Sequence, residues 1–316
     1  MLQLLRLLAD GHFHSGEELG AALGISRSAV WKQLQLLERL TGLSLFKVRG
    51  KGYRLERPIS LLANDILQAR LAPMSVCVEE QVDSTNALAI RLLAGQEPPF
   101  LVLAEAQTAG RGRRGRQWAS PYGANLYFSL VIRVDRSSTQ LQALSLVVGL
   151  AVLRVLRQAG VVDLGLKWPN DLLAAGKKIA GILLELNGDP ADACNVIIGI
   201  GINANMLTGS EIDQPWTSIQ LETGSLIDRC ELVAALAEEL GRMLAVHREH
   251  GFAAFHHDWE AQHLWQGREV RLISGVHEVK GTVLGVTGDG ALRLMVGGAE
   301  QVFSGGELSL RLQDDS

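Results

Sequence analysis

The sequence Gly110-Arg111-Gly112-Arg113-Arg114-Gly115-Arg116-Gln117-Trp118 begins with four arginines and three glycines in seven positions and ends on an indole. Glycine lets the backbone adopt positive φ angles and approach a ligand closely. Fixed guanidinium groups bind carboxylate and phosphate oxygens. Because glycines at this spacing also disfavour a helix, we expect a surface loop that is mobile alone and becomes ordered on an anionic ligand.

The segments on either side of this loop have the pattern of strands. Residues 100–104 are uniformly apolar, and residues 125–131 alternate between apolar and polar side chains. A solvated basic loop, or a nucleic-acid patch of the Arg-Gly kind, is the alternative interpretation. A disordered Arg-Gly tail is not flanked by strands, so the pattern favours a long binding loop attached to a sheet.

Composition indicates an ordinary globular protein with two or three domains. Of 316 residues, 47% are hydrophobic and 20% charged, which excludes a disordered chain. The apolar run 141–156 is interrupted by Gln142, Ser145 and Arg154, so it predicts a core helix and no membrane partner. The first residues lack an export signal, and we expect a cytoplasmic protein. The three cysteines are far apart and indicate neither a disulfide framework nor a zinc site.

The first 58 residues have the pattern of a winged helix-turn-helix. Ser15 and Glu18 form a capping box, Gly24 marks a turn, and Ser26 caps a predicted helix over 27–40. A hairpin over 45–55 with a glycine-rich, basic tip predicts the wing. Residues 1–57 carry nine Lys/Arg against five Asp/Glu, so this domain alone is basic. A protein-interaction module is the alternative, but the basic faces favour DNA. The expected DNA-binding residues are Arg27, Ser28, Lys32, Gln33 and Lys51.

The rest of the chain divides into two further parts. After a predicted connecting helix over 61–70, strand and helix patterns alternate from residue 76 to residue 201, which predicts an α+β or α/β core. A helix over 231–250 has an apolar face and is expected to pack on that core. From residue 267 the strands are short and the turns glycine-rich, which indicates a small β barrel.

Three motifs together show a resemblance to a known family. With the arginine-glycine run, Asp83-Ser84-Thr85-Asn86 and Lys167-Trp168-Pro169-Asn170-Asp171 resemble the bacterial biotin protein ligases that double as repressors of the biotin operon. The resemblance covers essentially the whole chain. It implies an α+β multidomain protein: a winged helix-turn-helix over 1–58, a mixed-sheet ligase core of the class II synthetase type over 59–265, and an SH3-like β barrel over 266–316.

The resemblance also implies a bifunctional protein. Such a ligase forms biotinyl-5′-AMP from biotin and ATP with Mg²⁺ and transfers biotin to a lysine of the biotin carboxyl carrier protein of acetyl-CoA carboxylase. With biotinyl-5′-AMP as corepressor, a homodimer formed on adenylate binding represses the biotin operon at its operator DNA. Because a carboxylate must approach an α-phosphate, the site needs fixed positive charge and exclusion of water.

The resemblance assigns roles to individual positions. The implied biotin-binding residues are Ser84, Thr85, Asn86, Gln107, Arg111, Gly112, Arg113 and Lys178. The implied ATP- and adenylate-binding residues are Arg116, Trp118, Lys167, Asn170, Asn203 and Trp216. The implied catalytic residues are Arg113, Lys178 and Asp171, and no residue is assigned as a metal ligand.

Some of these positions also have a purely structural interpretation. Residues 84–86 can cap a helix, which is compatible with biotin binding. Lys178, next to Lys177 at a predicted hairpin, can be a solvated charge. For Asp171, holding a metal ion and orienting the incoming lysine stay open. Residues 205–220 match the family's adenylate-covering loop only loosely, although Trp216 stands where an aromatic residue is expected.

Two other functions compete with the bifunctional ligase and repressor. One is a repressor that senses biotin without ligase activity, and the other is a ligase for a related acyl cofactor such as lipoate. A sensor has no need of Lys178 and an arginine cluster at a phosphate. A lipoate ligase has no use for ureido-binding groups around Gln107. The sequence therefore favours the bifunctional protein.

Overall fold

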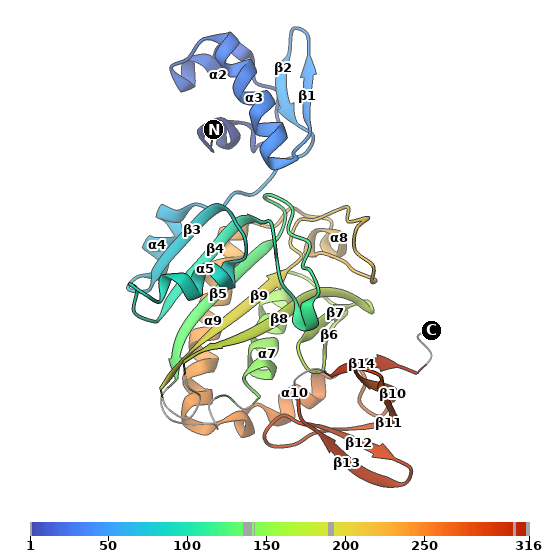
Figure 1. Cartoon of the computed structure of the whole chain (residues 1–316). Coiled ribbons are helices and arrows are strands. Elements are labelled where there is room, and N and C mark those ends of the chain that lie inside the picture. Colours follow the sequence, from blue (N-terminus) through green and yellow to red (C-terminus); the bar gives the residue numbers. More distant parts are fainter. Residues whose placement is uncertain (1, 135–140, 142, 189–192, 306–307, 314–316) are drawn as a thin grey trace.

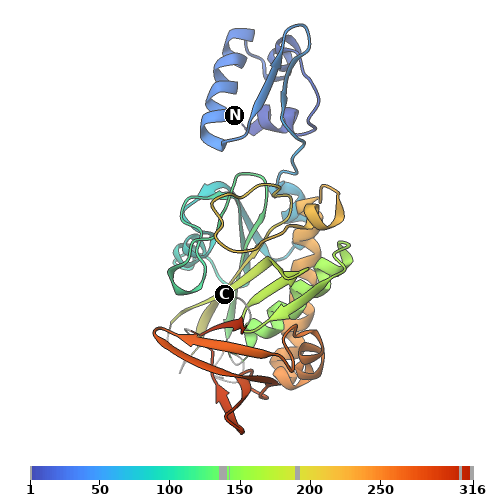
Figure 2. The same cartoon turned by 90° about the vertical axis from the view of Figure 1, so that its right-hand side faces the viewer.

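The computed structural model describes residues 2–134, 141, 143–188, 193–305 and 308–313. Figure 1 shows a small helical domain at one end, a central body around a large sheet, and a second, smaller sheet at the other end. In Figure 2 the N-terminal domain is joined to the body by a single stretch of chain. This order agrees with the three parts expected from the sequence.

The N-terminal domain is a winged helix-turn-helix, as predicted. It contains α1 (Leu2–Leu8), α2 (Gly16–Leu23), α3 (Arg27–Thr41) and a hairpin of β1 (Leu45–Val48) and β2 (Gly52–Leu55). The predicted capping box is confirmed, because Glu18 N donates to Ser15 Oγ and Ser15 N donates to the Glu18 carboxylate. Gly24 ends α2 in the left-handed region at φ 66°, which glycine adopts without steric cost.

The central sheet has seven strands in the order β3-β4-β5-β9-β8-β7-β6. Only the pairing of β3 with β4 is parallel among these neighbours, which confirms a mixed sheet. The strands are β3 (Ser75–Val82), β4 (Phe100–Gln107), β5 (Leu126–Val134), β6 (Leu164–Lys167), β7 (Asp171–Ala174), β8 (Lys177–Asn187) and β9 (Cys194–Ile202). The short strand β7 has no counterpart among the strands predicted from the sequence.

Helices cover both faces of this sheet. On β4, Phe100 and Val102 pack beneath α5 (Thr85–Leu92), whereas Leu101 and Leu103 face the opposite core with α7 (Leu144–Gln158) and α9 (Arg229–His250). The other helices of the described residues outside the winged domain are α4 (Asn64–Leu71), α8 (Ile219–Thr223) and α10 (His256–Gln262), with 3₁₀ turns η1 (Arg113–Gly115) and η2 (Phe252–Ala254). The side carrying α5 is only partly covered by helix, and this is where the candidate site lies.

The C-terminal part is a five-stranded antiparallel sheet in the order β13-β12-β11-β10-β14. Its strands are β10 (Glu269–Ser274), β11 (His277–Val286), β12 (Leu292–Val296), β13 (Ala299–Phe303) and β14 (Ser309–Leu312). Each predicted strand of this part is present. The buried Trp168 joins the sheet to the core, because its Nε1 donates to the carbonyl of Gly290 at 3.1 Å.

A buried ion pair fixes the segment that follows the winged domain. Arg229 and Glu105 lie inside the protein and pair with each other. The Arg229 guanidinium also donates to the carbonyl of Ser60 at 2.7 Å, and the Glu105 carboxylate accepts from Leu62 N at 2.6 Å. These contacts keep residues 60–62 out of a helix. The connecting helix therefore begins at Asn64, and the prediction that it begins at residue 61 is wrong.

Within the described residues, no helix has both the length and the apolar character needed to cross a membrane.

Candidate functional site

Three glycines open the face of the sheet beside α5. Gly181, Gly199 and Gly201 lie on neighbouring strands, with Gly181 paired to Gly201. A Cβ atom at Gly199 would lie 2.4 Å from Asn86 Oδ1, and one at Gly201 would lie 2.5 Å from the Trp118 ring. Only glycine therefore leaves room for the polar side chains and the indole that occupy this face.

A small cavity lies against these glycines, surrounded by linked polar groups. Thr85 donates to Gln107 Oε1 through both its amide (2.9 Å) and its hydroxyl (3.2 Å). The buried Ser129 hydroxyl lies 2.8 Å from Thr85 Oγ1 and 2.6 Å from Asn86 Oδ1. Asn86 Nδ2 donates to Glu185 at 2.7 Å. The chain thus builds a fixed set of donors and acceptors suited to a small polar ring.

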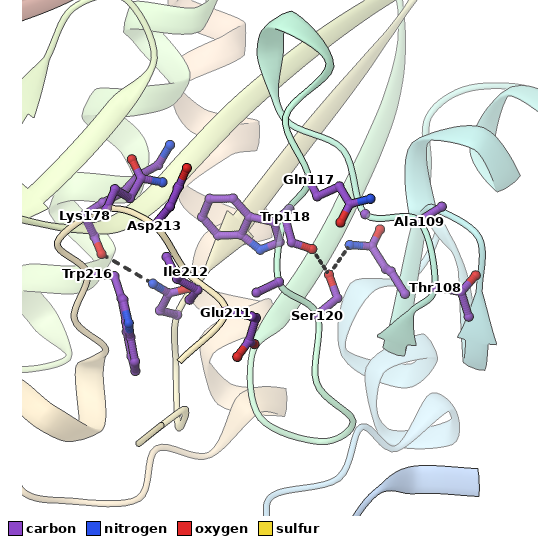
Figure 3. A pocket seen from close by; sticks show the side chains of 15 residues that line it. Thr108, Ala109, Gln117, Trp118, Ser120, Lys178, Glu211, Ile212, Asp213 and Trp216 are labelled. Carbon is purple, nitrogen blue, oxygen red and sulfur yellow. Dashed lines mark hydrogen bonds between the residues drawn. The ribbon is translucent and has the colours of Figure 1, made fainter. Parts of the chain in front are cut away.

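A second, larger cavity of about 330 Å³ adjoins the first. Its lining includes Gln107, Lys178, Asn203 and Trp216, and the acidic residues Glu211 and Asp213. In Figure 3 the labelled side chains come from the loop around Trp118 on one side and from Lys178 and the 211–216 segment on the other. A cavity of this size accommodates a nucleotide-sized or similar ligand.

The indole of Trp118 separates the two cavities. Trp118 lines both of them and lies in the middle of the site in Figure 3. The smaller cavity is about 30 Å³, which holds little more than a water molecule. The indole N–H is buried and has no hydrogen-bond partner in the described part of the chain. A ligand larger than water therefore needs the lining of the smaller cavity, which includes Trp118, to move.

Lys178 reaches the site because β8 contains a bulge. The pairing of β7 with β8 shifts register so that Leu172 pairs with Ala180 but Leu173 with Lys178. The extra residue turns Lys178 toward the cavity, whereas Ile179 and Ala180 both join the core. Lys178 Nζ lies 2.7 Å from Asp171 Oδ1 and 5.3 Å from the centre of the Trp118 ring.

The segment expected to cover an adenylate is attached to β8 at the same lysine. Lys178 N donates to the carbonyl of Pro215, and Thr217 N donates to the carbonyl of Lys178, both at 2.9 Å. Asn203 Nδ2 donates to the carbonyl of Thr217 at 2.9 Å. These bonds hold Trp216 at the mouth of the larger cavity, where a role in covering a ligand was expected.

The arginine-glycine loop is held by its own backbone and by side chains at its two ends. Trp118 N donates to the carbonyl of Gly110 at 2.9 Å, and Arg111 pairs with Gln117 as an isolated bridge. Arg111 Nη2 lies 3.0 Å from Glu185 Oε2. Arg113 extends to the other side, donating to Asn170 Oδ1 at 3.0 Å and to the carbonyl of Leu308 in the C-terminal part at 3.2 Å.

The structure brings together some of the residues expected at the site and leaves others apart. The expected residues that line one or both cavities are Ser84, Thr85, Asn86, Gln107, Arg111, Trp118, Lys178, Asn203 and Trp216. Six other described residues were expected to bind ligand or act in catalysis but line neither cavity: Gly112, Arg113, Arg116, Lys167, Asn170 and Asp171. Lys167 instead places its Nζ over the ring of Trp265, 4.7 Å from its centre.

Ser129 and Glu185 are polar residues beside the smaller cavity that the sequence prediction missed. Ser129 lies on β5 opposite Gly199, and Glu185 lies on β8 beside Asn86. Ser129 was a polar position of the alternating strand expected over 125–131, and this was the available signal. Glu185 carried no local signal, because its partners lie about a hundred and about seventy residues earlier in the chain.

A second surface, on the winged domain, has the exposure expected for DNA binding. Arg27, Ser28 and Lys32 on α3 and Lys51 at the hairpin tip are exposed, and Gln33 is half-buried. Lys51 Nζ lies 6.0 Å from the ring centre of Phe13. The cations of the helix and the hairpin are therefore available to phosphate groups.

All three parts of the chain match known protein families. Residues 78–203 match the biotin/lipoate A/B protein ligase family, residues 1–54 an HTH domain, and residues 266–311 the biotin protein ligase C-terminal domain.

The chain is similar along most of its length to proteins of known name. It is 42% identical over 312 residues to the bifunctional ligase/repressor BirA of Escherichia coli, covering 98% of this chain and 97% of that protein. The protein of the same name from Bacillus subtilis is 33% identical, with 94% of each chain covered.

A solved structure shares the fold of the larger part of the chain. The biotin protein ligase from Aquifex aeolicus in complex with biotin and ATP matches with a TM-score of 0.67 and 31% identity, covering 76% of this chain and 99% of that one. The segments matched by the three family models correspond, in chain order, to the winged domain, the seven-stranded sheet and the C-terminal sheet. The chain therefore belongs to the biotin/lipoate A/B protein ligase family, among the biotin protein ligases that carry an N-terminal helix-turn-helix.

Proposed function

We propose that this protein is a biotin protein ligase that also represses transcription of the biotin operon. The observation that carries the proposal is the pair of adjoining cavities with Lys178 and Trp118 at their junction. The smaller one offers donors and acceptors for a ureido ring, and the larger one has room for a nucleotide. A ligand carboxylate that extends from the first cavity meets the nucleotide beside Lys178.

The first chemical step joins two anions. A biotin carboxylate oxygen attacks the α-phosphorus of ATP, the new C–O–P bond forms, and the bond to pyrophosphate breaks. Lys178 is the cation placed at the junction, and its ammonium group reduces the repulsion between carboxylate and phosphate. The ion pair between Lys178 Nζ and Asp171 Oδ1, at 2.7 Å, orients the lysine. Arg113 is a second cation for this step if it leaves Asn170.

In the second step the amine of a carrier lysine attacks the acyl carbon, and AMP leaves. The segment around Trp216 and the arginine-glycine loop cover the larger cavity from two sides, which limits hydrolysis of the mixed anhydride. We propose the biotin carboxyl carrier protein of acetyl-CoA carboxylase as the acceptor, in line with the ligase names of the relatives.

Mg²⁺ fits this site as a partner of the ATP phosphates. In the described part of the chain no three His, Cys, Asp or Glu side chains gather as a metal site. Mg²⁺ bound to nucleotides commonly needs only one or two protein carboxylates, and Glu211 and Asp213 line the larger cavity. When bound, the ion neutralises phosphate charge. Asp171 is already paired with Lys178, which supports an orienting role for Asp171.

The winged domain supports the repressor function. A single winged helix with a small positive charge makes few phosphate contacts, so a monomer should bind DNA weakly at physiological salt. We propose that biotinyl-5′-AMP promotes a homodimer whose two winged domains bind the two halves of an operator, which makes the second contact intramolecular. We place this function in the cytoplasm and the domain boundaries after residues 58 and 265.

Biotin-dependent exchange of labelled pyrophosphate into ATP tests the ligase proposal. We expect exchange with biotin and none with lipoate. Binding of biotin without any exchange would indicate a sensor, and exchange driven by lipoate would indicate a lipoate-type ligase. Sedimentation with and without biotinyl-5′-AMP tests the repressor part, and a dimerisation constant that is independent of this ligand would contradict it.

A further inference from the structure

Glu185 occupies a position between the arginine-glycine loop and the wall of the smaller cavity. Its Oε2 atom accepts from Arg111 Nη2 at 3.0 Å and from Asn86 Nδ2 at 2.7 Å. Arg111 lies at the start of the loop, whereas the nearly fully buried Asn86 belongs to α5. One carboxylate oxygen thus contacts both the loop that we expect to be mobile and the buried wall of the expected biotin site.

The rigid side of this contact is well defined. Asn86 is oriented by the hydroxyl of Ser129, 2.6 Å from its Oδ1, and by its weaker bond to the carbonyl of Leu183. With Oδ1 directed to Ser129, the amide group of Asn86 must point toward Glu185. The side chain of Glu185 is only 25% exposed, so its interactions are less screened than those of a surface carboxylate.

The loop side of the contact has few other restraints. Arg111 pairs with Gln117 across the base of the loop, and Gly112 N donates to the carbonyl of Arg116 at 2.8 Å. These bonds lie within the loop and do not attach it to the sheet. Arg111 therefore provides the attachment near the smaller cavity, as Arg113 does near the C-terminal part.

We propose that Glu185 is a positioning residue that holds the arginine-glycine loop closed over the smaller cavity and so slows the escape of its ligand. The proposal deepens the proposed ligase function, since the retained ligand is biotin and its adenylate. The same oxygen of Glu185 accepts the bond from Arg111 that closes the loop and the bond from Asn86 that orients this side chain. Loss of the carboxylate charge opens the loop, whereas loss of the whole side chain also releases Asn86.

Limited trypsin digestion of the full chain tests whether Glu185 holds the loop closed. It needs no ligand, because the loop itself contains cleavage sites after Arg113, Arg114 and Arg116. Cleavage of a loop that opens and closes quickly reports the fraction of open loop. We expect Glu185→Gln to raise the rate of cleavage in the loop about fivefold, the effect of losing an ion pair worth about 1 kcal/mol. The matched control Glu300→Gln removes an Arg293–Glu300 pair of similar length, 2.7 Å, in the C-terminal sheet and should leave loop cleavage unchanged.

A charge exchange adds a second criterion. Glu185→Arg should open the loop further by repulsion of Arg111, and adding Arg111→Glu should return loop cleavage to within about twofold of the unchanged protein. With bound biotinyl-5′-AMP, Glu185→Gln should release the ligand faster than Glu300→Gln does. A merely structural role would lower unfolding stability instead and would not respond to the charge exchange.

Cleavage of Glu185→Gln at the same rate as Glu300→Gln would overturn the proposal, as would a charge-exchanged variant that stays as open as Glu185→Arg. These comparisons need no biotin. If the unchanged protein failed to bind biotin, the proposed function would fail while the digestion would still decide the role of Glu185.

Discussion

Replacing Glu105 by leucine should destabilise the central body strongly, because it leaves a buried cation without its counter-charge. Arg229 is fully buried, and Glu105 is its ion-pair partner. Two of the guanidinium's remaining contacts are to the carbonyls of Ser60 (2.7 Å) and Asn125 (2.9 Å), which do not carry a full charge. Removing one partner of a buried ion pair commonly costs 3–5 kcal/mol, so we expect a loss of about 4 kcal/mol.

The double variant Glu105→Leu/Arg229→Met separates the burial of charge from the loss of contacts. It removes both charges at similar volume, a change that is often close to neutral. The amide of Leu62 and the carbonyls of Ser60 and Asn125 lose partners in exchange. We expect the double variant to be more stable than Glu105→Leu alone, although less stable than the unchanged protein.

Urea unfolding of the full chain, followed by tryptophan fluorescence of the central body, measures both changes. The transition midpoint should fall while its slope stays the same. Operator binding should weaken as well, since residues 60–62 connect the winged domain to the core. A cost below about 1 kcal/mol for Glu105→Leu, or a double variant less stable than the single one, would contradict this account of the ion pair.

Four further predictions concern the site, the pH response and the winged domain. Lys178→Ala and Arg113→Ala should each lower single-turnover adenylate formation about a hundredfold, with circular dichroism showing that both variants stay folded; rates within about threefold of the unchanged protein would refute the assignment. Biotin binding should change tryptophan emission because Trp118 lines the smaller cavity, which is too small for the ligand as it stands. Trp118→Phe should abolish most of this change, and full retention of the change would contradict a movement of Trp118. Burial lowers the pKa of His263 from 6.5 to about 4, so between these pH values the unfolded state binds more protons than the folded state. The free energy of unfolding should therefore fall by about 2 kcal/mol from pH 7 to pH 5. An equal loss in His263→Phe would exclude His263 as the cause. Removal of residues 1–58 should abolish operator binding but leave adenylate synthesis in a folded protein, as circular dichroism and pyrophosphate exchange can check; a folded but inactive truncation would contradict independent domains.

The winged domain was predictable because its signals are local. The capping box of Ser15 with Glu18, the left-handed Gly24 and the glycine-rich hairpin tip each involve residues a few positions apart. The strand β7 was not predictable. It has four residues between Pro169 and Gly176, too few to show a period, and it forms only because β6 and β8 pair with it on either side.

The site was predictable as a set of residue types but not as an arrangement. The run 110–118 indicated anion binding, and the motif at 84–86 indicated a polar pocket. The direction of Arg113 toward Leu308, some 195 residues later, depends on how the C-terminal part packs, which leaves no trace near Arg113. The bulge that turns Lys178 into the site likewise depends on the register between β7 and β8.

Strand β4 connects the wall of the cavities to the segment that carries the winged domain. Its last three residues make three different contacts in succession. Glu105 pairs with Arg229 and holds residues 60–62, and Ala106 packs in the same apolar cluster as the core of the winged domain. Gln107 lines both cavities and accepts two bonds from Thr85. These three residues are consecutive in one hydrogen-bonded strand, so the wall of the cavities lies only two residues from the contact that holds the linker. We therefore expect a ligand that displaces Gln107 to change the orientation of the winged domain without contacting it, and scattering profiles that are identical with and without biotin would contradict this.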